Sequence, residues 1–246
     1  MNFVEYLIKT KQFKNVYKNY NLSAAARTVL KLLKYRLKFP NKYLREARCK
    51  DIIKESLGKL NKILEKEPAC VDLQSHDLGD ERPIKIITVG DIHFNEYALN
   101  YVLEYFYEVR EKDPNTHYKL LFLGDYTDRG YQAEKYDTQN TPLNVLVTLF
   151  KAKIQHPNDI IMLRGNHETS GANKRYGLSE KLNDNQLFND VNDTYNKLPI
   201  CACSSAVFFV HGSIPVLYKL NGANKNKGYK EILEDMKGIK KKGNYS

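Results

Sequence analysis

Three short motifs rich in acidic and histidine residues stand at the ends of apolar runs in this chain. They are GDIH (90–93), GDYTDRG (124–130) and RGNHE (164–168), and a fourth apolar run ends at His211. Carboxylate, imidazole and amide groups bind divalent metals, and a guanidinium group binds phosphate oxygens. Two metal ions roughly 3.5 to 4 Å apart can activate water and neutralise phosphoryl oxygens. The motifs therefore predict a two-metal phosphoester hydrolase.

Five side chains are the predicted metal ligands. Asp91 and His93 stand two residues apart, as two ligands at one strand end would. Asp125 is the candidate bridge between two metals, because a carboxylate has an oxygen for each. Asn166 offers a neutral amide oxygen and His211 an imidazole.

The remaining polar residues of the motifs suit the handling of a phosphorylated substrate. Arg129 can hold phosphate oxygens in a bidentate fork, and Asn166 is a second predicted substrate-binding group. His167 can protonate the departing alkoxide as a general acid. Asp128 can orient His167 and keep it protonated.

Each motif alone has an ordinary structural interpretation. A Gly-Asp pair after a strand is a common turn, and an Asn-His pair in a loop is usually polar surface. The specific signal is the occurrence of all three motifs in this order, each at a strand end. The other histidines, His76, His117 and His156, stand in polar contexts, and we expect them at the surface.

The motifs are separated by alternating strand and helix patterns. Apolar runs predict strands over 84–89, 120–123, 160–163 and 206–210, and helical spacing of apolar residues predicts helices over 98–109 and 143–150. This alternation favours right-handed crossovers around a largely parallel sheet. Ligands bind beyond the carboxyl ends of such strands, where the motifs fall.

The net charge of +10 is concentrated at the two ends of the chain. Residues 1–50 contain 13 basic residues (Lys and Arg) and 2 acidic ones (Asp and Glu). Residues 51–220 contain 19 basic and 24 acidic residues. Helices are expected over 24–37 and 44–66, with a polar loop after Pro68. The basic segment 1–40 can contact an anionic surface, or it can be a solvated helix packed on the domain by its apolar stripe.

Composition excludes several classes of protein. With 42% hydrophobic and 28% charged residues the chain has the makeup of a globular domain, and no run approaches the roughly 20 apolar residues of a membrane span. The N-terminus lacks the order of a signal peptide, so a cytoplasmic or nuclear location is expected. The spacing of the four cysteines indicates buried thiols in a reducing compartment: Cys49, Cys70, Cys201 and Cys203.

The three motifs resemble the GDxH, GDxxDRG and GNHE signatures of the PPP family of serine/threonine protein phosphatases, which are calcineurin-like metallophosphoesterases. The resemblance extends from roughly residue 50 to 216. It includes segments 63–68 and 188–212, Asn173, and Tyr176 with Gly177. It implies an α/β sandwich with two central sheets flanked by helices and a pair of Mn, Fe or Zn ions. The implied substrates are phosphoserine and phosphothreonine proteins, with a regulatory subunit as a further partner. Water would attack directly, with no covalent intermediate.

The sequence departs from that family in three places. Phe94 stands where the family has Gly after GDxH, and Ser213 stands where it has the second Gly of HGG. The family also has a phosphate-binding Arg and a last metal-ligand His further on, whereas here no Arg follows Arg175 and no His follows His211. We therefore expect 41–246 to form a C-terminally incomplete catalytic domain with impaired activity. The alternatives are an inactive pseudophosphatase that acts as a binding module and a nucleotide-cleaving metallophosphoesterase.

Overall fold

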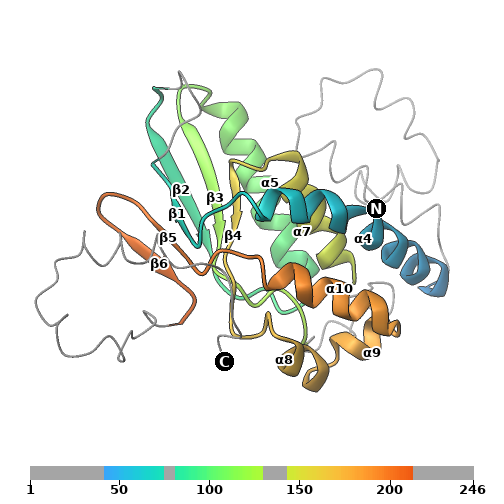
Figure 1. The fold of residues 1–246 in the computed structure, drawn as a ribbon. Helices are drawn as coiled ribbons and strands as arrows, with labels where there is room; N and C mark the ends of the chain where they lie inside the picture. Colours follow the sequence, from blue (N-terminus) through green and yellow to red (C-terminus); the bar gives the residue numbers. More distant parts are fainter. Residues whose placement is uncertain (1–41, 75–80, 130–142, 213–246) are drawn as a thin grey trace, which may run out of the picture.

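Two β-sheets pack face to face, and a layer of helices covers the outer side of one of them (Figure 1). The structure is a computed structural model that describes residues 42–74, 81–129 and 143–212. The elements are α4 (Lys42–Leu64), β1 (Cys70–Asp72), β2 (Ile84–Val89), α5 (Glu96–Lys112), β3 (His117–Phe122), α7 (Leu143–Gln155), β4 (Ile160–Met162), α8 (Ser170–Arg175), α9 (Leu178–Leu182), α10 (Asn185–Tyr195), β5 (Cys201–Cys203) and β6 (Phe208–Val210).

The first sheet is parallel, with strand order β2-β3-β4. Ile84 pairs with His117 across β2 and β3, and Leu120 pairs with Ile160 across β3 and β4. The crossovers contain α5 and α7, so the predicted order of strands and helices is confirmed over this part. The carboxyl ends of all three strands therefore lie at one edge, where the three motifs begin.

Strand β3 is buried on both faces. Leu120 and Phe122 belong to the large core shared with the helices, whereas Leu121 packs with Ile161 and Leu73 between the two sheets. All six residues of β3 are buried. A strand enclosed by helices on one side and a sheet on the other has this uniform burial. The result confirms the expected α/β class with central sheets flanked by helices.

The second sheet has strand order β1-β5-β6, with β1 and β5 parallel and β6 antiparallel to β5. The predicted strand over 206–210 therefore exists as β6 but belongs to this sheet rather than to the parallel one. The polar loop expected after Pro68 is wrong for Cys70–Asp72, which form β1. A strand of three residues is too short to show the alternation of apolar and polar side chains by which a strand is recognised in a sequence. All four cysteines are buried and free, as predicted.

Sequence reasoning did not find α8, α9 and α10. Helix α10 begins after Asp184, whose side chain accepts a hydrogen bond from the Leu187 backbone N–H at 3.0 Å. Its buried residues Leu187, Val191 and Tyr195 recur every four positions, which is a helical signal hidden among polar residues.

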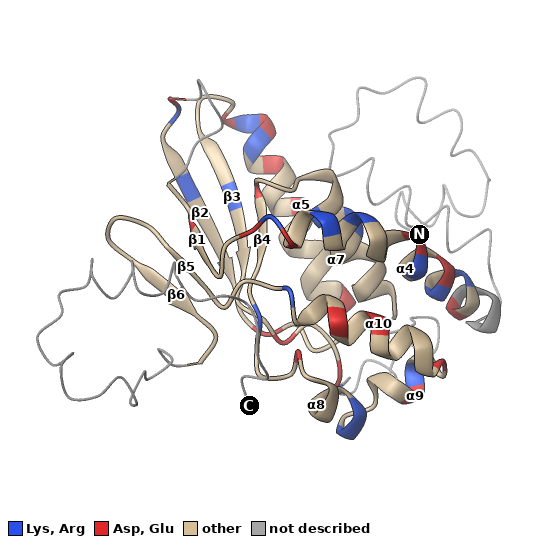
Figure 2. Ribbon diagram, in the orientation of Figure 1, with Lys and Arg blue, Asp and Glu red and all other residues tan. Residues whose placement is uncertain are grey.

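Charged residues of both signs lie mainly on the helices, and the strands of the central sheets carry few of them (Figure 2). Among the residues that the structure describes, no helix has the length and apolar character needed to cross a membrane. The helix expected over 24–37 and the surface contact expected for 1–40 lie outside the described residues.

The fully buried Lys153 joins three parts of the fold. Its Nζ donates hydrogen bonds to the backbone oxygens of Pro157 and Ile160, both at 2.7 Å, and forms an ion pair with Glu67. Burial lowers the pKa of Lys153, and Glu67 opposes that shift. The ammonium group connects the end of α7 and the start of β4 with the segment that follows α4.

We expect Lys153→Ala to lower the free energy of unfolding by about 3 kcal/mol or more, because it leaves the Glu67 carboxylate without its partner in a buried setting. Chemical denaturation measures the change. The matched control is Lys112→Ala, which removes an exposed ion pair with Glu108 on α5 and should leave the midpoint unchanged. Equal effects of the two substitutions would contradict this role for Lys153.

Candidate active site

The loops after β3 and β4 are joined by one buried carboxylate. Glu168 accepts hydrogen bonds from the backbone N–H groups of Asp125 at 2.7 Å, Tyr126 at 3.0 Å and Gly165 at 2.8 Å. Burial raises the pKa of Glu168 to about 8, while these three N–H groups favour its charged form. Glu168 of the RGNHE motif thus supports the backbone of the candidate site, a role that sequence reasoning did not give it. Its burial beside GDYTDRG was not visible in the sequence.

The same two loops touch through glycines. A Cβ atom at Gly124 would lie 2.5 Å from both the Cα and the N atom of Gly165, and one at Gly165 would lie 2.3 Å from Asp125 Oδ1. Gly124 also has φ of +123°, which side-chain-bearing residues rarely adopt. Only glycine at both positions lets the backbones approach this closely.

The predicted metal ligands converge at the edge formed by these loops. His93 Nε2 lies 3.6 Å from Asp91 Oδ2 and 3.6 Å from Asp125 Oδ2. His211 Nε2, just after β6, lies 3.4 Å from Asp125 Oδ1 and 2.9 Å from Asn166 Oδ1. Asp125 thus stands between two groups of ligand-type atoms, one with Asp91 and His93 and the other with Asn166 and His211.

The amide of Asn166 provides a test of whether a metal fits. Its Oδ1 faces acceptor atoms: the two Asp125 carboxylate oxygens at 3.2 and 3.1 Å and His211 Nε2 at 2.9 Å. Exchanging the amide O and N would turn these contacts into hydrogen bonds, and a divalent cation among the atoms would satisfy them without the exchange. Ligands about 2.1 Å from one octahedral ion lie about 3 Å from each other. The donor set therefore fits a divalent metal ion.

His167 and Asp128 form a buried pair beside this cluster. His167 Nδ1 lies 2.7 Å and 2.8 Å from the two carboxylate oxygens of Asp128. Burial raises the pKa of Asp128, and the hydrogen bond with His167 opposes the shift. A carboxylate beside Nδ1 requires that this nitrogen carry the proton. The other nitrogen, Nε2, lies 4.0 Å from Asp125 Oδ2 and so faces the candidate metal ligands.

His93 also approaches Asp128, at 3.6 Å between Nδ1 and Oδ1. Two groups of three side chains are therefore spaced closely enough to hold a metal ion. One is Asp91, His93 and Asp125, and the other is His93, Asp128 and His167. Asp128 is fully buried and both its oxygens are engaged by His167. We therefore interpret Asp128 as a partner of histidine rather than as a metal ligand.

The backbone is strained where these side chains emerge. Left-handed φ values occur at His93 (40°), Phe94 (59°), Asp125 (55°), Asp128 (69°) and Arg129 (48°), and among the described non-glycine residues only Asn183 shares this feature. Such conformations persist only where the surrounding structure enforces them, and they concentrate at functional sites.

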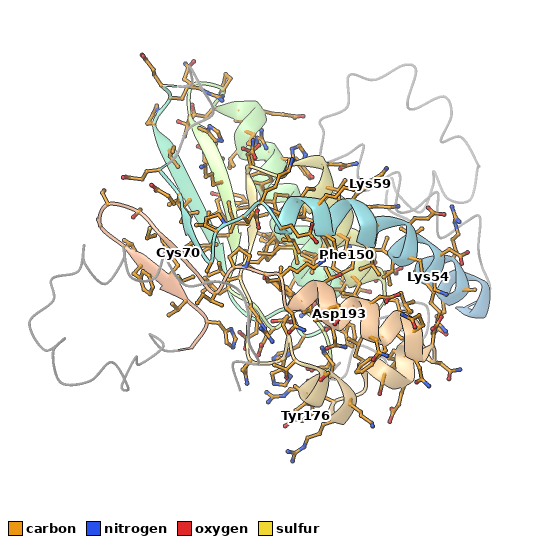
Figure 3. The ribbon with its side chains drawn as sticks, in the orientation of Figure 1. Lys54, Lys59, Cys70, Phe150, Tyr176 and Asp193 are labelled. Carbon is orange, nitrogen blue, oxygen red and sulfur yellow. The ribbon has the colours of Figure 1, made fainter. Side chains whose placement is uncertain are left out.

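Arg129 is exposed and lies beside Tyr176. Tyr176 follows α8 and is labelled in Figure 3. The Arg129 guanidinium lies 4.9 Å from the centre of the Tyr176 ring, and that ring is 4.9 Å from the His167 imidazole. The Arg129 N–H also donates to the Tyr176 backbone oxygen at 3.2 Å. Tyr176 thus contacts two of the predicted substrate-handling side chains, Arg129 and His167, a proximity that sequence reasoning did not reveal.

The structure also places several residues that the sequence analysis singled out. Phe94, which stands where the family has Gly, is buried in the main core. His117 is not a surface residue: it begins β3, is buried, and pairs with Asp159 at 2.8 Å. The predicted strand began three residues too late, which misplaced His117 in a loop. His156 is half-buried against Phe106, also contrary to expectation, and His76 lies outside the described residues.

The geometry agrees with what sequence comparison finds for this region. Residues 84–244 match the family model of the calcineurin-like phosphoesterases. The chain belongs to this family. A calcineurin-like phosphoesterase typically binds two divalent metals, and the groups of ligand-type side chains described above are compatible with that chemistry.

A curated relative and a solved structure are also similar to this calcineurin-like phosphoesterase. The Caenorhabditis elegans protein named "Putative serine/threonine-protein phosphatase C06A1.3" is 36% identical over 146 residues, which are 57% of this chain and 35% of the relative. The chain thus spans about a third of that protein's length. The solved structure is a Saccharomyces cerevisiae serine/threonine phosphatase described as similar to human phosphatase PP5. It matches with TM-score 0.49 and 25% identity, over 69% of this chain and 49% of its own.

We expect Glu168→Gln to lower the free energy of unfolding by about 1 to 3 kcal/mol. In either orientation, the NH2 group of the new amide points at a backbone N–H whose hydrogen bond the wild-type carboxylate accepts. At least one buried donor is then left without an acceptor. The matched control is Glu180→Gln on the exposed surface of α9. Denaturation midpoints measure both variants, and a Glu168→Gln variant as stable as the control would show that the three hydrogen bonds do not hold the loops together.

Proposed function

We propose that this chain hydrolyses phosphoserine and phosphothreonine monoesters in proteins. The observation that supports the proposal best is the convergence of five ligand-type side chains beside a buried His167–Asp128 pair with its Nε2 facing them. We further propose that the substrates are phosphoproteins, that a regulatory subunit is a partner, and that the protein is cytoplasmic or nuclear. Residues 41–246 would form the catalytic domain.

The ligands divide into two overlapping sets. Asp91, His93 and Asp125 would hold one metal, and Asp125, Asn166 and His211 would hold the other. The bound pair, Mn, Fe or Zn, would supply an activated water and neutralise charge on the phosphoryl oxygens. Asp125 belongs to both sets because its two oxygens face opposite partners, Oδ2 toward His93 and Oδ1 toward His211.

His167 would act as the general acid. Asp128 holds the Nδ1 proton, so a proton delivered to the substrate would be one carried on Nε2 of the doubly protonated ring. As water oxygen bonds to phosphorus, the bond to the serine or threonine oxygen breaks and that oxygen takes the proton from Nε2. The products are the free hydroxyl side chain and inorganic phosphate.

Arg129 and Asn166 would position the phosphoryl group. The Arg129 guanidinium is exposed and packs on the Tyr176 ring beside His167, where its N–H groups can donate hydrogen bonds to two phosphate oxygens. The exposed amide of Asn166 lies on the same side as the metal ligands. The curated name of the C. elegans relative supports a protein phosphatase over a nucleotide-cleaving enzyme.

The test is Mn²⁺-dependent release of phosphate from a phosphothreonine peptide by the 246-residue chain. We expect Asp125→Asn to reduce kcat/KM by about 10³-fold or more, because it weakens both metal sites, and His167→Asn to reduce kcat by about 10² to 10⁴-fold. The control is Asp193→Asn, an exposed change on α10 far from the motifs in the sequence, which should leave the rate unchanged (Figure 3).

Two outcomes would overturn the proposal. If the wild-type chain bound Mn²⁺ but released no phosphate, the inactive binding module would be the better account. If it cleaved a dinucleoside polyphosphate much faster than the phosphopeptide, the nucleotide-cleaving alternative would replace it.

A further inference from the structure

The helical layer contains a pocket that shares no residue with the candidate active site. Residues of helices α4, α5 and α7 line it, and its volume is about 480 Å³. Residues of α4 and α7 reach it at helical spacing, for example Ile52 and Ser56 on α4 and Val147 and Lys151 on α7. The size is that of a small-molecule site rather than of a protein groove.

The lower part of the pocket is apolar. Ile52, Leu103, Val147 and Ala152 line it, and all four are buried members of the main core. Tyr107 adds an aromatic wall from α5. The core is therefore continuous with the pocket surface, and an apolar ligand body could lie on it without displacing other contacts.

Positive charge gathers on the pocket wall. Lys59 and Lys151 both line it, and within residues 42–74, 81–129 and 143–212 neither makes a hydrogen bond or an ion pair. Arg48 is the third basic group, and its ion pairs within the described part of the chain are long and exposed, at 3.9 Å to Asp51 and 3.8 Å to Glu55. Burial, followed by the charge of Arg48, lowers the pKa of Lys151.

An anion in the pocket would relieve this repulsion. It would also meet the Thr148 hydroxyl, which lines the pocket and has no hydrogen-bond partner in the described part of the chain. Glu55 is the one acidic residue among the described lining groups, and its side chain is exposed to 67%. The lining therefore has a net positive charge above an apolar floor.

We propose that this pocket binds a small amphipathic anion. Its carboxylate or similar head would pair with Lys59 and Lys151, and its apolar body would lie between α4, α5 and α7. The proposal is independent of phosphatase activity, because none of the described residues that line the pocket takes part in the proposed hydrolysis.

The test is calorimetric titration of the full chain with decanoate, which combines a carboxylate with an apolar body. We expect one decanoate to bind per chain, and decylamine, with the same apolar body and the opposite charge, not to bind. The double variant Lys59→Gln with Lys151→Gln should weaken decanoate binding at least tenfold. The matched control is Lys62→Gln, an exposed lysine of α4 outside the pocket, which should bind as the wild type does.

A second variant separates binding in the pocket from binding elsewhere. Val147→Phe adds volume to the floor and should abolish decanoate binding while circular dichroism confirms a cooperative thermal transition. The proposal is overturned if decylamine binds as tightly as decanoate, or if the double lysine variant or Val147→Phe binds like the wild type. Binding of an acidic helical peptide in place of decanoate would also overturn it, because the occupant would then be a protein segment.

Discussion

The candidate site depends on the carboxylate of Glu168 more than on any metal ligand. Two loops that follow neighbouring parallel strands would otherwise point several unpaired N–H groups into a space with little water, at a cost of about 1 to 3 kcal/mol for each buried donor. Glu168 accepts three of them, from Asp125, Tyr126 and Gly165. Since Asp125 is itself one of these residues, the hydrogen bonds that join the loops also fix the backbone of the central predicted ligand.

This constraint explains the strained backbone around it. The contact between Gly124 and Gly165 brings the two loops together, and the chain then turns through left-handed conformations at Asp125 and Asp128. A further connection runs from Asp125 Oδ1 to the backbone N–H of His167 at 3.0 Å. The second sheet contributes His211 from the end of β6. Ligand-type side chains from four strand ends are thereby brought together by packing and hydrogen bonds within the protein.

The sequence predicted the side chains that could do chemistry better than it predicted the residues that hold them in place. Asp91, His93, Asp125, Asn166, His167 and His211 stand together because each follows a strand whose apolar run is easily recognised. Glu168 and Tyr176 were missed as supporting groups because their importance comes from contacts across the fold, which no local pattern records. Strand β1 and the true start of β3 were missed for a related reason: Cys70 and His117 are strand residues because they pair with Cys201 and Ile84, which are distant in the sequence.

The central claim is that side chains from four strand ends hold two divalent metals with Asp125 between them. Equilibrium dialysis of the chain against Mn²⁺, with the metal counted per protein, tests it directly. The account predicts two Mn²⁺ ions per wild-type chain and a clear loss of both stoichiometry and affinity in Asp125→Asn, with the fold intact by circular dichroism. An Asp125→Asn chain that binds as much Mn²⁺ as tightly as the wild type would contradict the account.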